Sequence, residues 1–267
     1  MKRRFIASLA LLAAFVGVVV GVRADRRGQL MLGGAAEPWS PLSLSGMVAW
    51  YQADDLITSS NLADGASVTA WSDRSGNGNT ITNPVATKQP IVKTNLYNGK
   101  HVVVFDGSND FLNDVTPTGY SGENGQTIFV AARWAAGAGG SFGNLVCTKA
   151  AGNELRLTAG EDTASAIFCG GLYTAGVGSG SSTNCYYLAH FDDAANETTL
   201  HKNFNQQTAG PGTETGAFSS DVIRLGSRSD GSLPFNGRIN EVIIYNRRLT
   251  TDERLLVWLY ASNRFGW

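Results

Sequence analysis

The chain has 267 residues, of which 43% are hydrophobic, 16% are charged and 32 are glycines. Residues 1–28 carry six of the 21 basic residues and one of the 22 acidic residues, which leaves the remaining chain with a net charge of −6. A mildly acidic body argues against a nucleic-acid partner, and the many glycines favour an all-β protein rich in turns over a helical one.

The N-terminus predicts export from the cytoplasm. Lys2-Arg3-Arg4 precedes an uncharged apolar run over residues 5–22, an arrangement typical of a secretory signal peptide. The run is also about as long as a membrane-spanning helix. Residues 1–24 are therefore expected to be a cleaved signal peptide or a retained membrane anchor. Both interpretations place the body in a secreted or extracytoplasmic surface position, with membrane contact only through this segment.

Residues 25–45 contain Gly, Ala, Pro and Ser without periodicity and predict a linker. Residues 46–267 are predicted to form one domain, in which short apolar or alternating runs are separated by turn residues. Strands are expected within 47–51, 68–71, 101–107, 127–134, 144–149, 154–159, 166–174, 185–192, 198–204, 221–227 and 237–246. Many short strands at near-regular spacing indicate an antiparallel sandwich or barrel.

One helix is expected at the C-terminal end of the chain. Thr250 stands three residues before Glu253, which is the spacing of a capping box. An apolar stripe over residues 255–259 follows. We expect the helix to pack on the sandwich through that stripe.

Four segments, residues 45–55, 68–79, 90–112 and 235–266, carry a resemblance in their sequence, order and spacing. Together they resemble the bacterial laminin-G-like domains of the concanavalin A-like lectin and glucanase superfamily. The resemblance implies an all-β jelly roll of two antiparallel sheets. Large apolar side chains at strand positions are then expected to fill the space between the sheets; these are Trp50, Trp71, Phe105, Phe111 and Ile243.

The acidic residues do not predict an enzyme. Laminarinase-type hydrolases of the same superfamily carry Glu-x-Asp-x-x-Glu on one strand, which places their carboxylates on one face. No Glu in this sequence is followed two residues later by Asp. The adjacent acids at 54–55, 161–162 and 192–193 would point to opposite faces of a strand, so solvated turns are the preferred interpretation.

Residues 73–79 (DRSGNGN) offer a candidate metal site, because oxygen-bearing side chains alternate as in the first half of an EF-hand loop. The twelfth position is Pro84 and not Glu, which excludes a true EF-hand. Two interpretations stay open: a turn in which Asp and Asn bond their own backbone, or a structural calcium held by Asp73 and Asn77. Related sandwiches hold calcium at a motif similar to Ile-Asp-Glu-Val, which by resemblance adds Asn240.

Histidine and cysteine give no further metal prediction. His101, His190 and His201 lack a metal-ligand spacing, so transition metals are not expected. None of the three cysteines is in C-x-x-C spacing. Cys169 and Cys185 flank a Gly/Ser-rich loop, and both a disulfide between them and separate thiols stay open.

A sugar site would need exposed aromatic side chains beside polar groups. Trp134, Tyr173, Tyr187 and Tyr120 are the candidates. The predicted function is a non-catalytic binding or adhesion module whose ligand is a glycan or a surface protein. A self-assembling structural protein, such as a virion decoration, tail-associated or appendage subunit, is the first alternative. A glycoside hydrolase with an unfamiliar site is the second.

Overall fold

A computed structural model describes residues 22–24, 30–32, 39–114, 116–120, 125–135, 143–148, 156–159, 166–169, 172–174, 185–192, 197–203, 205–211 and 222–266. The chain divides into two units, residues 1–43 and 44–267. The first contains an antiparallel pair, β1 (Val22–Ala24) and β2 (Leu30–Leu32), and the 3-10 helix η1 (Pro41–Ser43). Most of the predicted export segment lies outside the described residues, within which no helix is long and apolar enough to cross a membrane.

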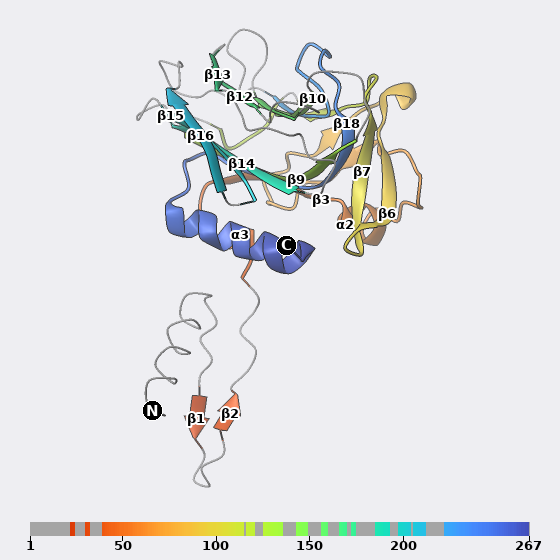
Figure 1. Ribbon diagram of the computed structural model, residues 1–267. Coiled ribbons are helices and arrows are strands. Elements are labelled where there is room, and N and C mark those ends of the chain that lie inside the picture. Colours follow the sequence, from red (N-terminus) through yellow and green to blue (C-terminus); the bar gives the residue numbers. More distant parts are fainter. Residues whose placement is uncertain are drawn as a thin grey trace. The chain divides into compact units, whose positions relative to one another are not determined.

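The second unit is a sandwich of two antiparallel sheets with a C-terminal helix, which confirms the predicted fold class (Figure 1). The helix-covered sheet has the order β16-β15-β14-β9-β18-β7-β6, and β3 also pairs with β18. Its strands are β3 (Met47–Gln52), β6 (Ile91–Tyr97), β7 (Lys100–Asp106), β9 (Gly125–Trp134), β14 (Cys185–Asp192), β15 (Glu197–Lys202), β16 (Asn205–Pro211) and β18 (Asn236–Tyr245).

The second sheet has the order β13-β12-β11-β10-β17-β8-β5-β4. Its strands are β4 (Ala70–Trp71), β5 (Ile81–Thr82), β8 (Leu112–Asp114), β10 (Gly143–Cys147), β11 (Arg156–Ala159), β12 (Ala166–Cys169), β13 (Leu172–Thr174) and β17 (Ile223–Leu225). The predicted run 166–174 is thus a hairpin of two strands. The short helices α2 (Asp54–Thr58) and η2 (Ala86–Lys88) lie in connections.

The core between the sheets contains two of the five expected large side chains, Trp71 and Phe105. The expectation is wrong for the other three. Trp50 and Ile243 are buried, but they are cross-strand partners on the opposite face, where Trp50 contacts Tyr260 of the C-terminal helix. Phe111 is only partly buried and lies under the guanidinium group of Arg224, 3.6 Å from its ring centroid.

The C-terminal helix α3 (Thr251–Phe265) begins as predicted. The Thr250 hydroxyl accepts a hydrogen bond from the backbone N–H of Glu253, and the Glu253 carboxylate accepts one from the backbone N–H of Thr250. This capping box satisfies two of the free N–H groups at the helix start. Figure 1 shows α3 lying across the outer face of the sheet that contains β3, β9 and β14.

Strand β18 is the centre of the helix-covered sheet. One of its edges pairs with β9 along residues 237–245, and its other edge pairs first with β7 and then with β3. The register shifts by one residue at Asn240, which forms a bulge. At this point the backbone oxygen of Asn240 accepts a hydrogen bond from the backbone N–H of Ala53. The side-chain Nδ2 of Asn240 donates to the backbone oxygen of His101 at 2.8 Å. Asn240 therefore joins the end of β3 to the start of β7.

Candidate functional site

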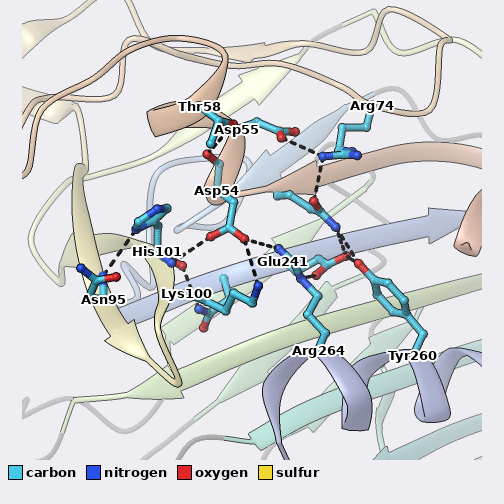
Figure 2. A network of polar contacts seen from close by, with 12 residues as sticks. Asp54, Asp55, Thr58, Arg74, Asn95, Lys100, His101, Glu241, Tyr260 and Arg264 are labelled. Atoms are coloured by element: carbon cyan, nitrogen blue, oxygen red, sulfur yellow. Dashed lines mark hydrogen bonds and ion pairs between the residues drawn. The ribbon is translucent and has the colours of Figure 1, made fainter. Parts of the chain in front are cut away.

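The outer face of the helix-covered sheet carries a buried carboxylate, Glu241 of β18, which is 0% exposed. Its Oε1 accepts hydrogen bonds from Trp50 Nε1 (2.6 Å), Tyr260 Oη (2.7 Å) and Gln52 Nε2 (3.0 Å). Its Oε2 forms an ion pair with Nε of Arg264, 2.8 Å away on α3. A buried carboxylate needs such partners, and here they attach α3 to β3 and β18 (Figure 2).

A second carboxylate, Asp54 of α2, extends this network. Its Oδ2 lies 2.7 Å from Nη2 of Arg264 and 3.8 Å from Nζ of Lys100. Its Oδ1 accepts the backbone N–H of His101 at 3.0 Å. Asp54 therefore links the end of α3 to the start of β7.

Arg74 closes the network on the side facing β3. Its Nη1 donates to Asp55 Oδ1 at 2.7 Å and to Gln52 Oε1 at 2.8 Å, and its guanidinium group lies 4.7 Å from the ring centroid of Trp50. The interpretation of Asp54 and Asp55 as a solvated turn is wrong. Both begin a short helix and both are ion-paired, and acidic residues are favoured in a first helical turn.

The charge at Glu241 serves the attachment of α3. Burial raises the pKa of Glu241, while Arg264 and the hydrogen bonds from Tyr260, Gln52 and Trp50 lower it by less. A general acid must come within hydrogen-bond reach of its substrate. Because the carboxylate is fully buried beneath α3, it does not meet that requirement in this structure.

The loop predicted to bind calcium begins with Asp73, whose carboxylate accepts four hydrogen bonds. Oδ1 accepts the backbone N–H groups of Trp50 (2.9 Å) and Ser75 (2.8 Å). Oδ2 accepts the hydroxyl of Ser75 (2.6 Å) and the backbone N–H of Asn79 (3.1 Å). These contacts form an Asx turn and tie the loop to β3.

The other two predicted ligands also contact the backbone. Asn77 Nδ2 donates to the carbonyl oxygens of Met47 (2.8 Å) and Val48 (2.9 Å). Oδ1 of Asn240 is buried without a hydrogen-bond partner among the described residues. Within those residues, no group of three or more His, Cys, Asp or Glu side chains is placed to hold a metal ion. A structural calcium held by Asp73, Asn77 and Asn240 stays a prediction.

Two of the three histidines come together at the N-terminal end of α3. The His190 and His201 rings have centroids 5.7 Å apart, and Nη1 of Arg254 lies 3.0 Å from Nε2 of His201. Burial, with the charge of Arg254 as a smaller contribution, lowers the pKa of His190 well below its usual range. His190 is therefore a neutral, buried part of the helix attachment.

Three of the aromatic candidates for sugar stacking are core residues. Tyr187 is 1% exposed, and Trp134 is 3% exposed with its ring centroid 5.6 Å from that of Phe235. Tyr120 is a third core residue, at 5% exposed. These rings present no open face to a sugar in this structure, although Trp134 contributes to the lining of the pocket described next. The backbone of Tyr173 lies in β13, and its side chain lies outside what the structure describes. The same holds for the side chains of Cys169 and Cys185, whose strands belong to different sheets.

A pocket with a volume of about 360 Å³ opens beside β6, β7, β9 and the start of β18. Its lining includes Leu96, Val104, Arg133, Trp134, Asn236 and Arg238. The polar groups that it offers are two guanidinium groups and one carboxamide. A Cβ at Gly237 would lie 2.3 Å from the carbonyl oxygen of Arg133, so the close approach of β18 and β9 at this pocket requires glycine.

Strand register places both arginines of the pocket on the outer face of the sheet. Arg238 lies directly opposite Arg133 on one side and Val104 on the other. The next row along the strands contains Ile239, which belongs to the core between the sheets. Adjacent rows of a sheet project from opposite faces, so the arginine row projects outward.

Sequence reasoning did not identify this pair. The available signal is Arg133 itself, because it is the one charged residue in the run 127–134. Arg238 similarly stands near the start of the predicted strand 237–246. What the sequence does not show is that the two positions are cross-strand neighbours, because strand register over long separations is not readable from it.

No protein-family model matches the sequence, and no curated protein matches it. Among solved structures, a Trypanosoma rangeli sialidase in complex with 2,3-difluorosialic acid is similar with a TM-score of 0.53 at 14% identity, covering 96% of this chain and 39% of that chain. A GH54 α-L-arabinofuranosidase gives a TM-score of 0.57 at 14% identity, covering 92% and 59%.

The receptor-binding domain of a botulinum neurotoxin mosaic serotype C/D gives a TM-score of 0.55 at 9% identity, covering 80% of this chain and 51% of that chain. The chain thus spans less than two thirds of each of these proteins. At such identities the likeness shows the fold alone, an all-β sandwich that also occurs in proteins acting on or binding sugars.

Proposed function

We propose that this chain is a non-catalytic, extracytoplasmic module that binds a glycan through the pocket on the outer face of its helix-covered sheet. The observation that carries the proposal is the pocket itself, with a volume of about 360 Å³. Ligand sites typically have volumes of about 300–1,000 Å³ and combine apolar walls with a few polar groups. Here Leu96 and Val104 supply apolar wall, and Arg133, Arg238 and Asn236 supply the polar groups.

The lining of the pocket supports binding in preference to hydrolysis. Glycoside hydrolysis generally uses two carboxyl groups that flank the scissile bond. The described residues that line this pocket include neither Asp nor Glu. Asp54 and Glu241, two carboxylates that lie away from the pocket, both pair with Arg264 of α3.

Further support comes from outside the pocket. Similar folds include a sialidase and an arabinofuranosidase, both of which act on sugars by their names. The basic, then apolar, N-terminal segment favours export to a compartment where glycans are exposed. The four matching segments remain our reason for proposing a laminin-G-like relationship.

A glycan array probed with the full-length chain tests the proposal. We expect retention of at least one class of oligosaccharide and no turnover of any polysaccharide offered. A V104W substitution should fill the pocket and weaken binding roughly tenfold or more, since displaced contacts of a few kcal/mol correspond to such factors. V85W is the matched control, because Val85 is 45% exposed and does not line the pocket.

Two results contradict the proposal. One is the absence of glycan binding by a correctly folded chain. The other is equal affinity of the V104W and V85W variants, which would place any glycan site away from the pocket.

A further inference from the structure

The pocket contains two like charges that face each other across neighbouring strands. Arg238 of β18 and Arg133 of β9 are direct cross-strand partners, and both side chains are partly exposed. Guanidinium groups remain protonated at any physiological pH. Like charges in directly opposed positions destabilise a sheet, so the protein maintains this pair against a cost.

None of the described residues that line the pocket is acidic. Within the described residues, the side chain of Arg133 makes no ion pair or hydrogen bond. The chain after residue 28 nevertheless has a net charge of −6. A concentration of positive charge in this pocket is therefore a local feature and does not follow from the general composition.

The geometry suits one chemical class of group. Arginine offers a planar set of N–H donors that matches the two oxygens of a carboxylate or the oxygens of a sulfate, and such charge-assisted contacts are short and strong. Two guanidinium groups on neighbouring strands of one pocket can both donate to the same oxyanion. Local departures from stabilising rules are expected at functional sites.

The rest of the lining fits a sugar that carries such a group. Leu96, which is 45% exposed, and Val104 offer aliphatic surface for the apolar face of a sugar ring. The amide of Asn236 can donate to and accept from hydroxyl groups. We infer that the ligand is an acidic glycan, whose carboxylate or sulfate lies between Arg133 and Arg238; this inference rests on the proposed function.

Titration calorimetry on the full-length chain tests the inference with three matched probes: an oligogalacturonate, a sulfated galactan oligosaccharide and a neutral galactan oligosaccharide. We expect at least one acidic probe to bind roughly tenfold or more tightly than the neutral one. The two acidic arms then distinguish carboxylate from sulfate. Binding should weaken with added salt, because the charges are partly exposed to solvent.

Substitutions test whether the preference for acidic probes depends on the pair of Arg133 and Arg238. R133M should reduce the affinity for the acidic probe roughly tenfold or more and leave any binding of the neutral probe nearly unchanged. R133K keeps the charge but loses the planar donor set, so it should fall between R133M and the unmodified chain. R228M is the control, because Arg228 carries the same charge outside the pocket. Each variant is first checked for cooperative melting at a temperature no lower than that of the unmodified chain.

The outcomes separate the inference from the function on which it rests. Equal binding of acidic and neutral probes overturns the inference and leaves a glycan-binding pocket in place. Equal losses in R133M and R228M also overturn it, because the effect would then be one of overall charge. Failure of all glycans to bind, including those on the array, overturns the proposed function.

Discussion

Two charged regions lie close together along β18 and are treated in opposite ways. Glu241 is fully buried, and its carboxylate has four partners, among them the opposite charge of Arg264. Arg238, three residues earlier, faces a second arginine in an open pocket. The comparison separates two uses of charge in one strand: a closed network that attaches a helix, and a pair of like charges at a pocket that is open to solvent.

The closed network contributes more to the choice of structure than to net stability. Removing two charges from water costs several kcal/mol per ion, and a buried pair often does no better than apolar residues of the same size. The loss of one partner is a different matter, because the remaining charge is then left buried. The network therefore makes the position of α3 specific, and it makes that position sensitive to single substitutions.

The largest effect on stability is expected from a substitution that removes the counter-charge of Glu241. Arg264→Leu should lower the free energy of unfolding by about 3–5 kcal/mol, because it leaves Glu241 buried without a counter-charge. Urea denaturation measures the change. Adding Glu241→Gln should recover at least about 1 kcal/mol through removal of that charge. The control Arg228→Leu, at an exposed ion pair, should change stability by less than about 0.5 kcal/mol. Similar losses for both arginines would contradict a closed network.

Asp73 provides a second closed carboxylate. Asp73→Ala should cost about 2–3 kcal/mol. A single hydrogen bond to a charged group is worth about 1.5–3 kcal/mol, and the four lost here do not add fully because water can reach the part-buried donors that remain. Thermal melting in calcium and in chelator measures the loss and tests the predicted metal at once. A melting temperature that rises with calcium in the unmodified chain, and not in the variant, supports calcium at this loop. An unchanged variant stability would contradict the role of Asp73 in holding the loop.

Glu253 is intermediate between a buried and an exposed carboxylate, because its side chain is hydrogen-bonded within the protein but lies partly at the surface. The hydrogen bonds from Arg247, with those from Thr250, lower the pKa of Glu253 from 4.5 to about 2. A carboxyl group whose pKa is lower in the folded chain than in the unfolded chain stabilises the fold at pH values above its unfolded pKa. That stabilisation is lost as the pH falls through its folded pKa. Glu253→Gln should therefore cost about 1–2 kcal/mol at pH 7 and almost nothing near pH 2. Circular dichroism during urea denaturation at several pH values checks this, and a cost that does not depend on pH would contradict it.

A substitution in the arginine pair is expected to have the smallest effect on stability, and to raise it. Arg133→Met should raise the free energy of unfolding by about 0.2–1 kcal/mol, because it removes a like-charge cross-strand contact. The gain should shrink in high salt, which screens exposed charges. Urea denaturation at low and high salt is the measurement. A loss of stability would indicate that the pair is structural, and would remove the contrast with Glu241.

The sequence predicted the fold better than the site, for physical reasons. The capping box of α3 is local, so Thr250 and Glu253 identified the helix start correctly. Trp50 and Ile243 were misplaced because α3 covers the outer face of their strands, which leaves both faces buried and removes the alternation that separates inside from outside. Short strands such as β5 have too few residues to show a period. The pocket depends on the pairing of β9 with β18, and that pairing is a property of the folded sheet.

The bulge at Asn240 determines which of these charges meets solvent. In a regular strand, residues 238 and 241 would point to opposite faces, since side chains alternate. The extra residue restores the phase, so that Arg238 and Glu241 project from the same face. The bulge also divides β18 into two segments: residues 236–239 pair with β7, and residues 241–245 pair with β3. Substitutions in the segment that lines the pocket have local consequences. Deletion of Asn240 would instead turn side chains that face the core outward, and outward-facing side chains inward, along half of β18.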